Sequence, residues 1–127
     1  MHDQIYNYYL TSFNSKEMPK RFCRYPNVVL RPDKQKTNLI VCPCLEFATS
    51  IAACAALDAG ADVAVVWEAL YLSGQQPSYR YHVYSQPTHN IDWLVSRYGG
   101  AANISKPGRC GWFDSMITPI QVEHLFT

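Results

Sequence analysis

An alanine-rich segment over residues 44–60 limits the fold of this chain more than any other feature. Its larger apolar side chains recur at spacings of three and four residues, which is the period of one face of an α-helix. Gly60 stands where the residue beyond a helix C-terminus is commonly found. The pattern predicts a helix over residues 44–59, and its small side chains favour close packing of that helix against a sheet.

Extended segments are expected on both sides of this helix. The apolar, β-branched run 38–41 predicts an extended strand or loop that leads into the helix. Residues 62–70, 78–85 and 91–95 predict three strands after it, because each run combines apolar or aromatic residues with flanking turn residues. The sequence therefore predicts an α+β fold in which the helix packs on a small antiparallel sheet.

The chain is long enough for one domain and too short for two ordinary ones. Its predicted core is residues 44–96. Residues 1–40 form an expected irregular lead-in because three prolines interrupt them, although residues 5–13 could form a short helix or an edge strand. Several glycines and prolines predict a mostly irregular tail over residues 97–127.

The charge balance argues against several classes of partner. Eleven Lys and Arg residues against ten Asp and Glu residues give a formal charge of +1, so no uniform field attracts nucleic acid or an anionic membrane. No apolar stretch reaches the roughly 18 residues of a membrane-spanning helix. The first residues lack the basic-then-apolar order of a signal peptide, which predicts a cytoplasmic location.

The cysteines are expected to be reduced thiols. Their number is odd and no secretory signal precedes them, which argues against a disulfide framework. Cys54 is expected to fill the core as a small apolar side chain. Cys44 stands at the predicted helix start, where unpaired backbone N–H groups and the helix dipole favour a thiolate. The five are Cys23, Cys42, Cys44, Cys54 and Cys110.

A catalytic thiolate needs a histidine to share its proton and a polar group to orient the imidazole ring. His82 lies in the middle of a predicted strand, flanked by tyrosines, and Asp92 opens the next predicted strand. Cys44, His82 and Asp92 are therefore the candidate catalytic residues, and the Cys44 backbone N–H is the expected oxyanion donor. The candidates for substrate contacts are Trp67, Tyr81 and Trp93.

Residues 44–48, Cys-Leu-Glu-Phe-Ala, followed by an alanine-rich helix, resemble the start of transglutaminase-like cysteine enzymes of the papain-like superfamily. Residues 77–84 resemble the strand that carries the catalytic histidine in that superfamily, often as His-Val-Tyr. Residues 29–32 are similar to the lead-in of its small phage and bacterial members. The likeness covers about residues 28–95.

The resemblance implies a papain-like core in which the helix that carries Cys44 packs on an antiparallel sheet. It implies a cysteine-dependent hydrolase or acyltransferase that acts on an amide or peptide bond of a protein or peptide substrate. Cys44 would attack the carbonyl and His82 would take and return the proton. No cofactor or metal is implied.

Two departures from the family pattern leave alternatives open. The family usually has an acid before the cysteine, where this chain has Pro43. Its aspartate usually follows a tryptophan, whereas Asp92 precedes Trp93, so Asn90 and Asp114 are alternatives for the third catalytic residue. The alternative function is a binding module of the same fold, without chemistry, such as a phage or bacterial protein that captures a partner protein or a small ligand.

Each candidate residue also has a structural interpretation. Cys44 could be a small buried side chain, His82 a hydrogen-bonding residue between strands, and Asp92 a turn residue. A further alternative is a zinc site made of Cys42, Cys44, His82 and His89, since cysteine and histidine are the usual zinc ligands.

Overall fold

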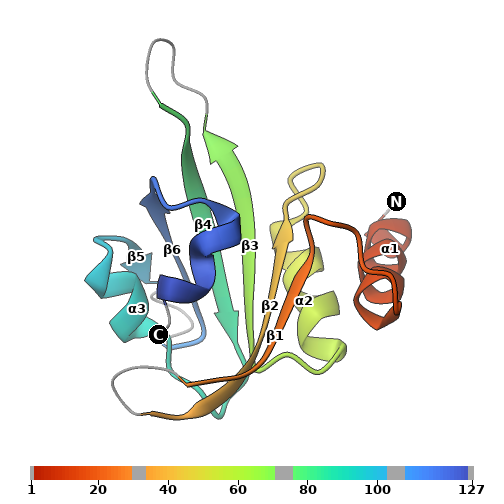
Figure 1. Cartoon of the computed structure of the whole chain (residues 1–127), viewed down its shortest axis with the longest axis horizontal. Helices are drawn as coiled ribbons and strands as arrows, with labels where there is room; N and C mark the ends of the chain where they lie inside the picture. Colours follow the sequence, from red (N-terminus) through yellow and green to blue (C-terminus); the bar gives the residue numbers. More distant parts are fainter. Residues whose placement is uncertain (1, 30–33, 71–75, 103–107, 126–127) are drawn as a thin grey trace.

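The structure, a computed structural model, describes residues 2–29, 34–70, 76–102 and 108–125 of the chain. These residues form one sheet in the order β1-β2-β3-β4-β6-β5, with helices on both of its faces (Figure 1). The strands are β1 (Cys23–Val29), β2 (Lys36–Pro43), β3 (Val63–Leu70), β4 (Ser78–Ser85), β5 (Ala101–Ala102) and β6 (Cys110–Ser115). The helices are α1 (His2–Asn14), α2 (Thr49–Asp58), α3 (Asp92–Arg97) and the 3₁₀ helix η1 (Pro119–Leu125).

The α+β fold class is confirmed, but the prediction of an antiparallel sheet is wrong. β2 pairs with β3 in parallel, and the other pairs are antiparallel. The cause is the connection through α2, because a helical crossover returns the chain so that the next strand runs in the same direction. The extended segment before the helix is thus a strand inside the sheet.

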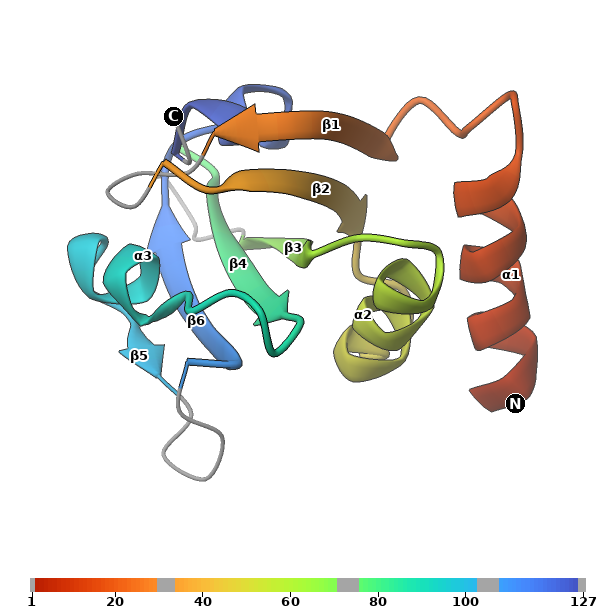
Figure 2. The same cartoon turned by 90° about the horizontal axis from the view of Figure 1, so that it is seen from below.

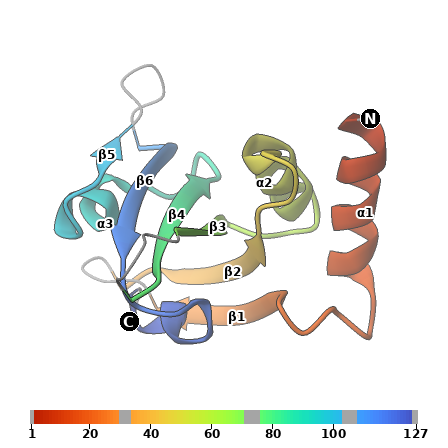
Figure 3. The ribbon, with the colours of Figure 1, turned by 90° about the horizontal axis from the view of Figure 1, so that it is seen from above.

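Alternate side chains of β3 point to opposite faces of the sheet. Ala64 and Val66 lie with Ile40 and Cys42 on the face that α1 and α2 cover, which we call the α1/α2 face. The opposite face, here the α3 face, holds a second core that α3 and η1 complete. Figures 2 and 3 show α1 and α2 on one side of the strands and α3 on the other.

The helix predicted from the alanine-rich segment is present but shorter. Four of its alanines, Ala52, Ala53, Ala55 and Ala56, are buried against the sheet and α1, which agrees with the expected close packing. It ends before Gly60, whose φ of 103° is in the region that glycine adopts at little cost. Cys54 points outward and is exposed, so its prediction as a core residue is wrong.

The strand predicted over residues 91–95 is wrong, because Asp92–Arg97 form α3. Ile91, Leu94 and Val95 are fully or almost fully buried on the α3 face. Their spacing of three and four residues is that of a helix face. A short apolar run satisfies the patterns of both a strand and a helix, and here tertiary packing decides between them.

The two ends of the chain are more regular than predicted. Residues 5–13, for which a helix and an edge strand were both possible, belong to helix α1. Strand β1 occupies part of the lead-in that was expected to be irregular. In the expected irregular tail, β6 lies between β4 and β5. Gly100 permits this packing, since a Cβ there would lie 1.9 Å from the Trp112 carbonyl oxygen. This glycine allows close approach of the backbones rather than breaking the structure.

One finding bears on the predicted absence of a membrane span. Among the described residues, no helix combines the length and apolar character that crossing a bilayer requires.

Candidate functional site

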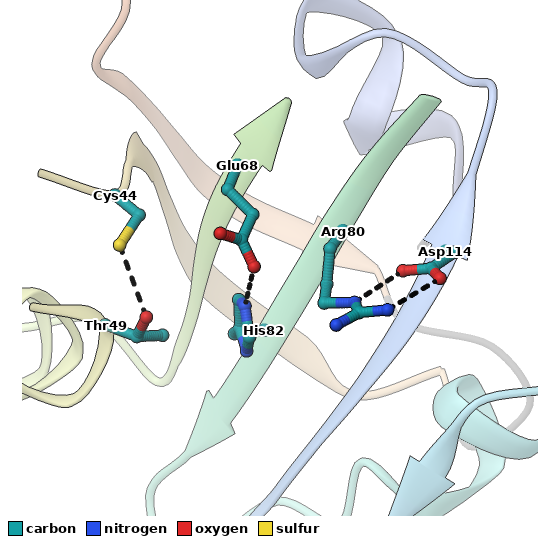
Figure 4. Close-up of polar contacts among 6 residues, drawn as sticks. All are labelled: Cys44, Thr49, Glu68, Arg80, His82 and Asp114. Atoms are coloured by element: carbon teal, nitrogen blue, oxygen red, sulfur yellow. Dashed lines mark hydrogen bonds and ion pairs between the residues drawn. The ribbon is translucent and has the colours of Figure 1, made fainter. Parts of the chain in front are cut away.

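Cys44 follows the last residue of β2 and lies five residues before Thr49, the first residue of α2. The prediction that the helix begins at Cys44 is therefore wrong. Glu46 and Phe47 have φ values of 50° and 59°, a left-handed conformation that a right-handed helix cannot contain. The Cys44 sulfur lies 3.3 Å from the Thr49 hydroxyl oxygen (Figure 4), so the thiol contacts the first residue of the helix through its side chain.

The turn that carries Cys44 is held by hydrogen bonds on both sides. The Cys44 N–H donates to the Trp67 carbonyl oxygen at 2.7 Å. The Leu45 N–H donates to the Tyr9 hydroxyl at 3.0 Å, and that hydroxyl donates to the Pro43 carbonyl oxygen at 2.6 Å. The Cys44 N–H is thus already paired and is not free to serve as the expected oxyanion donor.

His82 has a carboxylate partner that sequence reasoning missed. Its Nε2 lies 3.1 Å from Glu68 Oε1 on the neighbouring strand β3, and the two side chains are 21% and 35% exposed. β3 and β4 form a hairpin in which Glu68 pairs with Arg80 and Val66 with His82. Glu68 and His82 are therefore diagonal neighbours on one face. This pair could have been predicted only from the register between β3 and β4, and the sequence alone does not determine that register.

Cys44 and His82 lie on the same face of the sheet. Cys44 packs against the core on the α1/α2 face. His82 and Tyr84 lie two residues apart in β4 and point to the same side, and Tyr84 packs against that core. Figure 4 shows Glu68 and His82 together, with the Cys44–Thr49 contact to one side. Because β3 separates β2 from β4, the two backbones are about 10 Å apart, and the structure joins Cys44 to Thr49 rather than to His82.

The structure does not bring Asp92 to His82. Asp92 lies in α3, and its Oδ1 accepts a hydrogen bond from the Gly108 N–H at 3.1 Å. Asn90 is beside it, because its side-chain oxygen accepts from the Asp92 N–H at 2.9 Å. Helix α3 packs on the opposite face of the sheet from His82. Neither residue is therefore in the position that orients the His82 ring.

Asp114, the other alternative, pairs with Arg80. The contacts run from Arg80 Nε to Asp114 Oδ1 at 2.8 Å and from Arg80 Nη2 to Oδ2 at 3.1 Å (Figure 4). The Arg80 guanidinium also lies over the Trp112 ring, 4.3 Å from its centroid. The bidentate contact raises the pKa of Arg80, which stays charged. Asp114 is therefore paired with Arg80, and the carboxylate in contact with His82 is that of Glu68.

The three residues expected to contact substrate all pack on the α3 face. Tyr81 is fully buried, and its hydroxyl donates to the Ile117 carbonyl oxygen. Trp67 and Trp93 pack against the same core. Their indole N–H groups are buried and have no hydrogen-bond acceptor among the described residues. None of the three therefore faces the thiol of Cys44.

The expected zinc ligands are not gathered into one site. No cluster of three or more His, Cys, Asp or Glu side chains arranged to hold a metal ion is found in residues 2–29, 34–70, 76–102 and 108–125. Cys42 is fully buried, and burial raises the pKa of its thiol well above the ordinary value. His89 Nδ1 contacts the Thr88 hydroxyl at 2.9 Å. Cys42 therefore stays a neutral thiol, whereas Cys44 is partly exposed.

The left-handed turn after Cys44 predicts a stabilising substitution. Phe47 is 97% exposed and has a φ of 59°, so its side chain loses little packing when removed. Left-handed backbone costs a non-glycine residue about 1–2 kcal/mol, and the greater entropy of glycine in the unfolded chain offsets about half of the gain. Phe47→Gly should raise the free energy of unfolding by about 0.5–1 kcal/mol in urea titrations. Phe47→Ala is the matched control, and an equal gain from alanine would contradict the role of the backbone.

Comparison with known proteins adds no family assignment. The sequence matches no protein-family model, and no curated protein matches it significantly. The chemistry assigned to the site therefore rests on its residues and their placement.

Proposed function

We propose that this chain is a cysteine-dependent hydrolase or acyltransferase that acts on an amide or peptide bond, with Cys44 as nucleophile and His82 as general base. One observation carries the proposal. The partly exposed His82 imidazole, held by Glu68, lies on the same face of the sheet as the Cys44 thiol. Glu68 takes the orienting role first assigned to Asp92. Protein or peptide substrates follow from the resemblance to transglutaminase-like enzymes.

The proposed reaction uses each of these groups in turn. With His82 Nε2–H donating to Glu68, the ring nitrogen Nδ1 is the base that takes the Cys44 proton. The sulfur attacks the carbonyl carbon, and the leaving amine takes the proton from His82. A thioester remains, and water or a second amine resolves it. The proposal requires the Cys44 side chain to turn away from Thr49 toward β4, which would free the Thr49 hydroxyl to donate to the oxyanion.

The resemblance supports the assignment of Cys44 and His82 but only part of the fold that it implies. The cysteine, the alanine-rich helix, a strand and the histidine strand follow one another in the order typical of the superfamily. Two observations depart from its core: the sheet is mixed, and the cysteine precedes the helix rather than beginning it. A transglutaminase-like core is thus part of the proposal.

A binding module is the second candidate, and specific contacts favour it. The N–H groups of Cys44 and Leu45 are both paired, and the thiol contacts Thr49 instead of His82. The same turn exposes Phe47 almost fully, together with 37% of Leu45. Exposed apolar side chains on a turn with fixed backbone suit contact with a partner protein.

Alkylation by iodoacetamide at pH 7 tests the catalytic proposal. If His82 draws the proton from the thiol, Cys44 should react about tenfold faster than Cys54, although Cys54 is the more exposed thiol. Mass spectrometry after timed quenching measures each rate. The variants His82→Ala and Glu68→Gln should remove the difference, whereas His124→Ala, at an exposed histidine, is the matched control.

Two outcomes distinguish the candidate functions. Fast Cys44 labelling that depends on His82 supports the enzyme. If Cys44 reacts no faster than Cys54, and His82→Ala changes neither rate, the catalytic proposal fails and the binding module is favoured.

A further inference from the structure

A cavity of about 410 Å³ opens on the α3 face of the sheet, away from Cys44. Residues just before β1, the β3–β4 hairpin and η1 surround it. Trp67, predicted to contact substrate, lines this cavity rather than the surroundings of the thiol. Its volume falls in the range of roughly 300–1,000 Å³ that small-molecule sites occupy.

The inner wall of the cavity is aromatic. The rings of Trp67 and Tyr79 meet edge to face, with their centroids 6.0 Å apart and an angle of 83° between the planes. Pro119 and Ile120 of η1 extend the apolar surface, and Ile120 is 83% exposed. Aromatic rings in such a pair offer further ring faces and edges to a planar apolar group.

The charged side chains that the structure describes at this cavity are both positive. Lys20 and Arg21 line it and are exposed, and no acidic residue is among the described residues of its lining. The whole chain carries a formal charge of only +1. The two positive charges at the cavity are therefore a local feature and do not reflect a generally basic surface. A guanidinium next to an ammonium favours a carboxylate, which arginine binds through two parallel hydrogen bonds.

We propose that this cavity binds a small aromatic carboxylate, with its ring against Trp67 and Tyr79 and its carboxylate at Lys20 and Arg21. The aromatic wall supplies apolar contact for the ring. The two cations supply the charge complementarity that selects an anion over a neutral molecule of the same shape. The site is separate from Cys44 and His82, which lie on the other face of the sheet.

Ligand-observed NMR titration of the full chain with 2-naphthoate tests the proposal, with 2-naphthamide as the neutral analogue. Naphthoate should bind about tenfold more tightly than naphthamide, and the double variant Lys20→Ser/Arg21→Ser should remove that preference. The double variant Lys16→Ser/Lys36→Ser is the matched control, since it removes the same charge at two exposed lysines outside the cavity and should keep the preference.

Cys23 lines the same cavity and gives a second readout. Saturating naphthoate should slow the alkylation of Cys23 without slowing that of Cys54 or Cys110. Equal affinity for naphthamide, an unchanged preference in Lys20→Ser/Arg21→Ser, or unprotected Cys23 would each overturn the proposal. Cys44→Ser should bind naphthoate as the unmodified chain does. The test of this site is therefore independent of the test of the proposed catalytic site.

Discussion

At pH 11 the folded chain is expected to be about 5 kcal/mol less stable than at pH 8. Three fully buried acids cause this loss: Cys42, Tyr9 and Tyr81. Burial is the largest cause that raises the pKa of each one above its ordinary value, which is 9.0 for the thiol and 10.0 for the phenols. In the unfolded chain, all three lose their protons at their ordinary values.

The direction of the effect follows from proton linkage. A group whose pKa is raised by folding contributes its full stability below its unfolded pKa, and that stability is lost as pH rises toward the folded pKa. The loss therefore begins near pH 9 with Cys42 and steepens above pH 10, where Tyr9 and Tyr81 join it. Each group contributes about 1.4 kcal/mol for each pH unit above its unfolded value.

Urea unfolding followed by circular dichroism between pH 8 and pH 11, with reductant present, measures this profile. Cys42→Ala should move the onset of the loss from about pH 9 to about pH 10, because only the tyrosines then titrate. Cys54→Ala is the control, since Cys54 is exposed and its removal should leave the profile unchanged. A free energy of unfolding that stays constant up to pH 11 would contradict the burial argument.

Sequence reasoning was most successful where local pattern and tertiary packing agree. The strand over residues 78–85 was predicted with the bounds that β4 has, and the alanine-rich run does contain α2. The predictions for α3 and β6 were wrong. The buried apolar residues at α3, Ile91, Leu94 and Val95, cover too short a stretch to show a full helical repeat. In β6, Gly111 is of a residue type that is common in turns. A Cβ at Gly111 would lie 2.8 Å from Val95, so contact between distant segments explains this glycine.

The sequence proposes the residues of the candidate site but not their contacts. Cys44 and His82 were proposed from the sequence, whereas the side chains that contact them, Thr49 and Glu68, were not. Glu68 depends on the register of a hairpin, and one shift of register would turn it to the other face. The turn at Cys44 depends on Tyr9, a residue from α1 that local patterns around the cysteine do not include.

Tyr9→Phe is expected to lower the free energy of unfolding by about 2–3 kcal/mol. The hydroxyl of Tyr9 accepts from the Leu45 N–H and donates to the Pro43 carbonyl oxygen, and the ring is fully buried. Phenylalanine keeps the packing but leaves the carbonyl oxygen and the N–H without a partner. Tyr8→Phe is the matched control, because Tyr8 is adjacent and 47% exposed.

The same variant separates the stability of the turn from its chemistry. Pro43 and Leu45 flank the cysteine, so loss of the Tyr9 hydroxyl should loosen the position of the thiol. If that position serves catalysis, the alkylation rate of Cys44 should fall toward that of Cys54 under conditions where Tyr9→Phe is still folded. If the rate is unchanged while stability falls, the turn only supports the fold. A Tyr9→Phe chain as stable as Tyr8→Phe would contradict the role of the hydroxyl itself.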